Sequence, residues 1–179
     1  MLKSENAALL IIDIQGNLYQ SMHEKEALRE NLQKLIKGTA ALDIPVIVTE
    51  QVPEKLGPSI PEIASLVDEF HPIPKSSFSC CGEPRFTDRL EKTGRRHILV
   101  AGIESHVCVY QTAADLLRLG YEAHIITDCI SSRTAENRHA GIERMIAEGG
   151  RRTSMEMVLF ELLRTAEGDV FRTIAKIVK

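Results

Sequence analysis

Three side chains that together could carry out thiol chemistry are spread widely along the 179-residue chain: Asp13, Lys75 and Cys108. A deprotonated cysteine sulfur is a strong nucleophile, and a nearby carboxylate can accept the thiol proton as a general base. A lysine ammonium beside them stabilises the thiolate and the charge that develops on a carbonyl oxygen under attack. Each residue also has an ordinary explanation: a turn aspartate, a solvated lysine and an inert buried cysteine. The three can act together only if the fold brings them to one place.

Apolar runs of strand type alternate along the chain with amphipathic segments of helical period. The expected strands are residues 7–12, 45–49, 70–73, 97–102 and 123–127, with a short one near Arg152. The expected helices are residues 24–42, 84–93, 106–119, 134–147, 155–165 and 168–178, and residues 51–63 are expected to form a loop with one short helix. This alternation predicts βαβ units and an α/β fold with α/β/α layers. We expect a single domain over residues 1–179, built on a doubly wound, Rossmann-like, six-stranded parallel sheet in the order 3-2-1-4-5-6.

The carboxyl ends of parallel strands meet at one edge of the sheet, where open α/β sheets bind their ligands. Asp13 ends the first expected strand, Lys75 follows the third, and Cys108 follows the fourth. We therefore expect the fold to gather these three side chains at that edge. A dinucleotide site is the rival use of the same edge, but DIQGNLYQ after the first strand holds one glycine and no G-x-G-x-x-G pattern. No cofactor is expected.

The place of Cys108 in the chain bears on its reactivity. It lies in the first turn of the helix expected over 106–119, where the helix dipole and the free amide groups lower the pKa of a thiol. Two other interpretations remain open. A non-hydrolytic redox or sensor protein would oxidise Cys108 and resolve it with Cys80 or Cys81, whereas an idle scaffold of the same fold would leave the thiol unreactive.

Composition and charge restrict the class of partner. The net charge of −3 and the pI near 6.1 do not favour nucleic acid or an anionic membrane. No apolar run approaches the roughly 20 residues that a membrane-spanning helix needs. The first residues, MLKSENAALLIID, lack the basic region and the cleavage site of a signal peptide. We expect a cytoplasmic protein with a small-molecule substrate and free thiols at Cys80, Cys81, Cys108 and Cys129.

Three segments carry a resemblance to a known family: LLIIDIQ at 9–15, PKSSFSC at 74–80 and VAGIESHVCVYQTAADLLRLGYEAHIITDCISSR at 100–133. Together they resemble the isochorismatase-like cysteine hydrolase superfamily, and the likeness extends over nearly the whole chain. Two more segments, TEQVPEKLGPSIPEI at 49–63 and SSRTAENRHAGIERM at 131–145, are similar to its isochorismatase domain-containing branch.

This resemblance implies a catalytic triad of Asp13, Lys75 and Cys108 that cleaves a small amide-like C–N substrate through a thioester, with the substrate itself left open. It also implies a cis peptide bond between Ile103 and Glu104. That bond would turn the Glu104 amide inward beside the amide of Cys108, so that the two form an oxyanion hole.

The resemblance also bears on metals. The nicotinamidase branch holds a metal with an Asp-x-His pair and later histidines after the second strand. Residues 49–63 contain no histidine, so a metal site of that type is not expected here.

Four more residues are candidates for contact with the substrate. Gln15 and Gln51 could bind a substrate amide, and Tyr19 and Phe78 could form an apolar wall. Hydrogen bonding within loops and ordinary core packing are the alternatives.

The C-terminal segment suggests assembly. Its apolar rows lie at helical spacing and are expected to be exposed: Met155, Val158, Leu159, Leu162 and Leu163. Because members of the superfamily are commonly oligomers, the resemblance implies a homo-oligomer, a dimer or a tetramer. The alternative is that these rows only cover the edge of the sheet.

Overall fold

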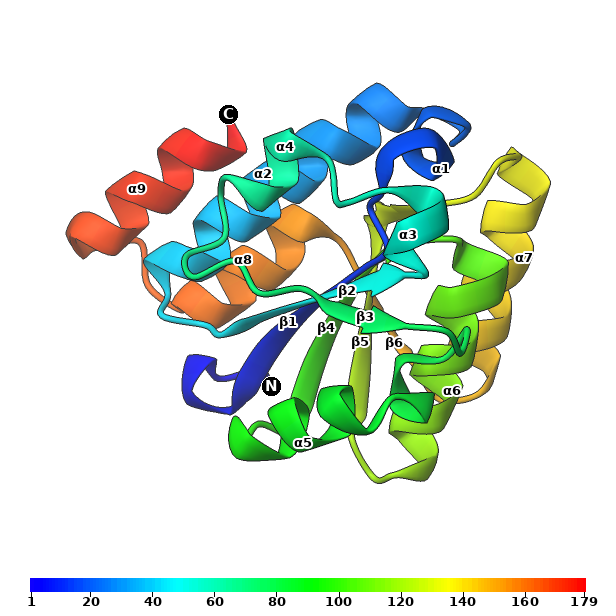
Figure 1. Cartoon of the computed structure of the whole chain (residues 1–179). Helices are drawn as coiled ribbons and strands as arrows, with labels where there is room; N and C mark the ends of the chain where they lie inside the picture. Colours follow the sequence, from blue (N-terminus) through cyan, green and yellow to red (C-terminus); the bar gives the residue numbers. More distant parts are fainter.

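A single parallel sheet organises the chain, and the computed structural model describes all of residues 1–179. Six strands lie in the order β3-β2-β1-β4-β5-β6, as predicted (Figure 1). Their bounds are β1 Ala7–Ile12, β2 Val46–Gln51, β3 Ile73–Lys75, β4 His97–Ile103, β5 Glu122–Ser131 and β6 Arg151–Thr153. The order reverses direction at β1, so the crevice between β1 and β4 is the topological switch point of the sheet.

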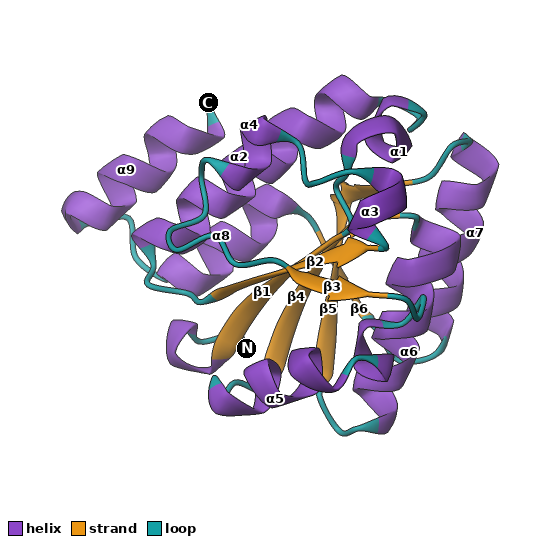
Figure 2. Ribbon diagram, viewed as in Figure 1, coloured by secondary structure: helices purple, strands orange, loops and turns teal.

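Helices cover both faces of the sheet, with α2, α8 and α9 on one side and α5, α6 and α7 on the other (Figure 2). Their bounds are α1 Gly16–Gln20, α2 Lys25–Ala41, α3 Pro53–Leu56, α4 Pro61–Ala64, α5 Pro84–Lys92, α6 Tyr110–Arg118, α7 Ala135–Ala147, α8 Met155–Leu163 and α9 Gly168–Val178. Short 3-10 turns lie at Ser4–Asn6 and Cys80–Gly82. The three-layer α/β/α architecture is therefore confirmed.

The central strand β1 explains why its sequence is apolar without interruption. All six of its residues are buried, because helices cover both faces. Leu9 and Ile11 point into the larger core beneath α2 and α8, whereas Leu10 and Ile12 point into the smaller core beneath α5 and α6. A continuous apolar run is what a strand between two cores requires.

Some expected boundaries were wrong. The third strand is Ile73–Lys75 rather than 70–73, because only these residues pair with the end of β2. Where a loop with one short helix was expected over 51–63, the structure has two short helices, α3 and α4, each with a proline in its first turn. Strand β5 runs on to Ser131, so Asp128 lies inside it and its carboxylate accepts a hydrogen bond from the Met155 amide.

A glycine marks the irregular place in the sheet. The register between β4 and β5 shifts between Val100 and Gly102. Gly102 has φ +130°, and a Cβ there would collide with the Ile12 carbonyl oxygen. Only glycine fits where the end of β4 passes this close to β1.

The helix expected over 106–119 begins differently from the prediction. Its first turn is a π-helix over Ser105–Val109, and the regular helix α6 starts at Tyr110. Cys108 therefore lies in a π turn, a form that is rare in general and frequent at functional sites.

The C-terminal apolar rows are not an exposed surface. Met155, Val158, Leu159 and Leu162 are buried against the sheet within one chain, so the expectation that they are exposed was wrong.

None of the helices combines the length and the apolar character that a membrane-spanning helix needs.

Candidate active site

A buried ion pair joins the ends of two strands. Asp13 directly follows β1 in the left-handed conformation (φ +55°), and Lys75 is the last residue of β3. Lys75 Nζ donates to Asp13 Oδ2 over 2.8 Å, and neither side chain has any exposure to solvent. The sheet therefore brings together two residues that the sequence separates widely, as the strand-end rule predicts.

The ammonium of Lys75 is held by several acceptors. Besides Asp13 it donates to Gln51 Oε1 over 2.6 Å and to the carbonyl oxygens of Ser77 and Phe78 over 3.2 and 3.0 Å. These acceptors occupy its three protons, so its position is fixed. Lys75 therefore acts on a neighbouring sulfur through its charge rather than through a hydrogen bond to the sulfur.

Thr49 is a member of the site that the sequence did not single out. Its hydroxyl donates to Asp13 Oδ1 over 2.9 Å, and the Thr49 hydroxyl oxygen also lies 3.6 Å from the sulfur of Cys80. Thr49 pairs in register with Ile12, the residue before Asp13. A polar residue near the end of an otherwise apolar strand was the available signal, but threonine is common in strands.

Cys108 completes the cluster. Its residue is 6 % exposed, and its sulfur lies 4.0 Å from Gln51 Oε1. Burial and the negative charge of Asp13 raise the pKa of its thiol to about 12, while the charge of Lys75 acts in the opposite direction. The expected lowering of this pKa by a helix start was wrong, because desolvation and the neighbouring carboxylate dominate. The resting thiol is protonated.

The carboxyl group of Asp13 is suited to accept that proton. Burial raises its pKa above the ordinary value, and the charge of Lys75 and the Thr49 hydroxyl restrain the rise. For Lys75, burial lowers the pKa, but the negative charge of Asp13, with smaller contributions from Cys80 and Cys108 when these are ionised, outweighs it, so the net pKa is raised. A raised pKa makes the Asp13 carboxylate a stronger base than an ordinary one, and the raised pKa of Cys108 favours its neutral thiol.

A backbone donor lies at the start of the same turn. The peptide bond between Ile103 and Glu104 is cis. The Glu104 carbonyl accepts from the amides of Val107 and Val109, whereas the Glu104 N–H donates to no acceptor in the protein. The Glu104 side chain forms an ion pair over 3.0 Å with Arg133, another residue that the sequence did not single out. The amide of Glu104 is thus free to bind an oxygen of a ligand.

The four candidate substrate residues take different places. Gln15 is fully buried, and its side-chain amide bonds to the backbone of Gln51 and Gly57, so it braces a loop and is corrected from substrate ligand to structural residue. Tyr19 is also corrected: it packs in the larger core and its hydroxyl donates to the Lys25 carbonyl.

The other two candidates remain near the ion pair. Gln51 accepts from Lys75 and donates to the Ser76 carbonyl over 2.9 Å. Phe78 offers its carbonyl to Lys75 and is 53 % exposed. Of these two, Gln51 also lies beside Cys108, with its Oε1 atom 4.0 Å from the sulfur.

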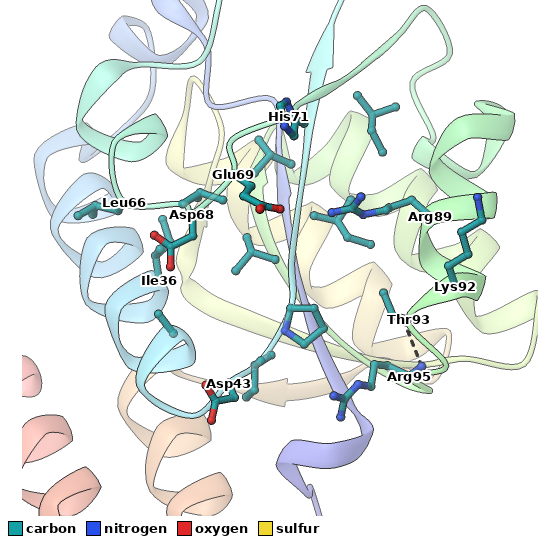
Figure 3. A pocket seen from close by; sticks show the side chains of 18 of the residues that line it. Ile36, Asp43, Leu66, Asp68, Glu69, His71, Arg89, Lys92, Thr93 and Arg95 are labelled. Atoms are coloured by element: carbon teal, nitrogen blue, oxygen red, sulfur yellow. Dashed lines mark hydrogen bonds between the residues drawn. The ribbon is translucent and has the colours of Figure 1, made fainter.

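A separate groove lies away from these residues, along β2 and β3. It has a volume of about 820 Å³, and none of its lining residues belongs to the ion pair or carries a thiol. Asp68 and Glu69 stand on one side, across from Arg89 and Lys92 on α5 (Figure 3). This groove and the cluster around the ion pair are therefore different places.

Comparison with known proteins agrees with this fold and identifies a family. The isochorismatase domain family matches residues 7–157. Isochorismatase domain-containing protein 2A of Mus musculus is 31 % identical over 176 residues, which cover 98 % of this chain and 84 % of the mouse protein. Isochorismatase domain-containing protein 2 of Xenopus laevis is 32 % identical over 178 residues, with 99 % and 85 % covered.

Two solved structures show the same architecture. The MAR1 ribonuclease of Caenorhabditis elegans superposes with a TM-score of 0.92 at 32 % identity, covering 99 % of this chain and 91 % of that one. The YcaC product of Escherichia coli, described as an octameric hydrolase of unknown specificity, superposes with a TM-score of 0.93 over 98 % of this chain and 88 % of its own. Its 23 % identity shows the fold alone. The chain belongs to the isochorismatase domain family and has the fold of its hydrolases.

Proposed function

We propose that the protein is a cysteine hydrolase that cleaves a small amide-like C–N bond through a thioester. The observation that carries the proposal is the buried Asp13–Lys75 ion pair, 2.8 Å long, near the thiol of Cys108 at the carboxyl-end edge of the sheet. A nucleophile, a base with a raised pKa and a fixed positive charge are the groups that acyl transfer needs.

In the first half of the reaction, Cys108 Sγ attacks the substrate carbonyl while its proton passes to the Asp13 carboxylate. Because the thiol has a pKa of about 12, the proton moves during the attack rather than before it. The carbonyl oxygen becomes an oxyanion, which the amides of Glu104 and Cys108 bind. Each such donor typically contributes about 3 kcal/mol to the transition state. When the intermediate collapses, Asp13 returns the proton to the leaving amine and a thioester remains.

In the second half, water attacks the thioester and gives a proton to Asp13. The C–S bond breaks, the proton returns to the sulfur, and a carboxylic acid leaves. Lys75 keeps its charge throughout, because its pKa is raised and its acceptors hold it in place. It stabilises the negative charge on sulfur, and Asp13 is a base in each half-reaction.

An activity screen tests the proposal. Purified protein is offered small amides, carbamoyl compounds and esters, and mass spectrometry searches for an acyl adduct on the Cys108 peptide. Cys108→Ala should abolish turnover and adduct, whereas Cys81→Ser, which changes a half-buried thiol outside the triad, should retain both. Full hydrolysis by Cys108→Ala on a verified substrate would refute the mechanism.

The redox interpretation makes a different prediction. Cys80 is fully buried beside Thr49, and burial raises the pKa of its thiol to about 11, so its thiolate is scarce at neutral pH. Mild peroxide followed by peptide mapping should give a disulfide between Cys108 and Cys80 or Cys81 if the protein is a redox sensor. We favour hydrolysis, for which this mapping should show neither disulfide.

RNA is a further substrate class to test. One relative of known structure is described as a ribonuclease. The net charge of −3 does not favour RNA as a partner of this chain, and we propose a small-molecule substrate instead. RNA included in the screen should remain intact.

We further propose that the protein forms a homo-oligomer. The YcaC product is described as octameric, and Met157 and Phe160 on α8 are 60 % and 38 % exposed here. Light scattering during size-exclusion chromatography measures the mass directly, and a mass of one 20.0 kDa chain would contradict the proposal.

A cytoplasmic location is also a proposal. It is supported by four free cysteines, which a reducing compartment preserves. A relative in Phytophthora sojae, 30 % identical over 180 residues that cover 97 % of this chain and 85 % of that protein, is described as a secreted effector. Cell fractionation followed by immunoblotting would decide the location.

A further inference from the structure

A cluster of metal-binding side chains lies at the amino ends of β4 and β5, at the opposite end of the sheet from Cys108. It consists of His97, Glu122 and His124. His97 is the register partner of Glu122, and His124 lies two residues further along β5. Residues that pair across strands, or lie two apart on one strand, share a face of a sheet. The strand pairing therefore points all three side chains to the same side.

The spacing of their ligand atoms fits a metal ion. His97 Nδ1 lies 3.1 Å from His124 Nε2 and 3.5 Å from Glu122 Oε2. In a tetrahedral zinc site with bonds of about 2.0–2.1 Å, neighbouring ligand atoms lie roughly 3.3–3.4 Å apart. All of these ligand atoms lie within 4.8 Å of one another. A small rotation of the Glu122 side chain therefore brings the carboxylate oxygen to coordination distance of an ion held by the two histidines.

We propose that His97, Glu122 and His124 form a site for a divalent transition-metal ion, of which Zn²⁺ suits the ligands best. Two imidazoles and one carboxylate are a common three-residue ligand set for zinc, and water completes the tetrahedron. His97 Nδ1 and His124 Nε2 share one proton in their hydrogen bond. When a metal binds, this proton moves to the other nitrogen of the same ring, so that both facing nitrogens can coordinate the ion. No thiol takes part.

The burial of the two histidines favours a metal site over a chance proximity of exposed side chains. His124 is 5 % exposed, and the His97 side chain is 16 % exposed. Rings held this firmly lose little freedom on binding a metal. The bound ion would tie β4 to β5 at their amino ends.

A neighbouring cation competes for the carboxylate. Arg151 Nη2 on β6 lies 2.7 Å from Glu122 Oε2. The Arg151 side chain is 60 % exposed, so it can turn into solvent when a metal binds. The geometry therefore predicts that removal of this arginine strengthens metal binding, an effect that a purely structural role of the cluster would not produce.

Titration of the full-length protein with Co²⁺ as a spectroscopic probe, and with Zn²⁺ in competition, tests the site. We expect one Co²⁺ per chain, with the intense visible bands of tetrahedral nitrogen and oxygen ligation and without a thiolate charge-transfer band. His97→Gln and His124→Gln should each weaken binding roughly 10- to 100-fold or more. Arg151→Gln should strengthen it several-fold.

The matched control is His139→Gln, which changes an exposed histidine paired with Glu143 on α7 and should leave the affinity unchanged. Circular dichroism checks that each variant is folded, and the Arg151→Gln result does not depend on the histidine variants. Absence of tetrahedral bands, a thiolate band, or equal affinity in Arg151→Gln would each overturn the proposal. None of these outcomes bears on hydrolysis at Cys108, which lies at the other end of the sheet.

Discussion

Asp13 and Lys75 depend on each other at the scale of single residues. Both side chains are fully buried, so each charge is tolerated only because the other is 2.8 Å away. The same burial raises the pKa of Asp13 and of the Cys108 thiol. In the proposed mechanism, the proton therefore starts on the sulfur of Cys108 and Asp13 accepts it.

We predict that Lys75→Met destabilises the fold and abolishes catalysis. It leaves a buried carboxylate without its opposite charge, with the Thr49 hydroxyl as a remaining side-chain donor, and breaking such a pair costs about 3–5 kcal/mol. Asp13 then favours its neutral form in the folded state, so the loss should be largest at neutral pH and should shrink toward about pH 4, where the unfolded chain is protonated as well. Urea unfolding at both pH values measures this, and Asp13→Asn/Lys75→Met should recover part of the stability. An equal loss at both pH values would contradict the prediction.

Thr49→Val tests the tuning of the base. The hydroxyl bond to Asp13 lowers the pKa of that carboxyl, so its removal should raise the pKa further. In the proposed mechanism, Asp13 works as a base only when ionised, so activity should be lost as the pH falls through its pKa. The acid limb of the kcat/KM profile should therefore move to higher pH. Thr39→Val is the control, because that hydroxyl bonds only to carbonyls of its own helix. An unshifted limb would show that Thr49 does not tune the base.

At the scale of elements, the close approach of β4 to β1 sets the geometry of the site. Gly102 lies against the backbone of Ile12. Ile12 is the residue before Asp13, and Gly102 lies two residues before Glu104. This contact brings the base and the free amide of Glu104 to the same edge of the sheet. Any larger residue must separate the two strand ends.

Gly102→Ala should therefore be severely destabilising, by more than about 4 kcal/mol, since a Cβ would collide with a backbone oxygen at a φ of +130°. Gly94→Ala is the matched control: its φ is +66°, but a Cβ there meets no atom, so only a backbone cost of about 1 kcal/mol is expected. Thermal unfolding of both variants makes the comparison. Similar losses would show that the approach of β4 to β1 is not sterically tight.

At the scale of the whole molecule, helix α8, the last but one in the chain, covers the larger core. Leu159 is fully buried and fills the space over Gly38 of α2, whereas Met157 on the same helix is 60 % exposed. We predict that Leu159→Ala lowers the free energy of unfolding by about 2–5 kcal/mol and that Met157→Ala changes it by less than about 0.5 kcal/mol. Chemical denaturation measures both values. A small loss for Leu159→Ala would mean that α8 is not part of the core.

Much of the fold and of the site could be predicted from sequence patterns. The uninterrupted apolar run of β1 and the helical spacing of Leu28, Leu32 and Leu35 indicate which segments are strands and helices, because burial imposes those periods. The rule that ligand sites lie at the carboxyl ends of strands then grouped Asp13, Lys75 and Cys108.

Other features were decided only by the tertiary structure. The pKa of Cys108, the part played by Thr49 and the bracing role of Gln15 depend on neighbours from other strands and on burial, which no local pattern encodes. The same holds for the proximity of His97 to Glu122 and His124, which follows from strand register. The sequence by itself determined the elements and the side chains able to do chemistry, since local periodicity and residue type suffice for both. The structure decided their charges and partners, because desolvation and Coulomb interactions depend on distances in three dimensions.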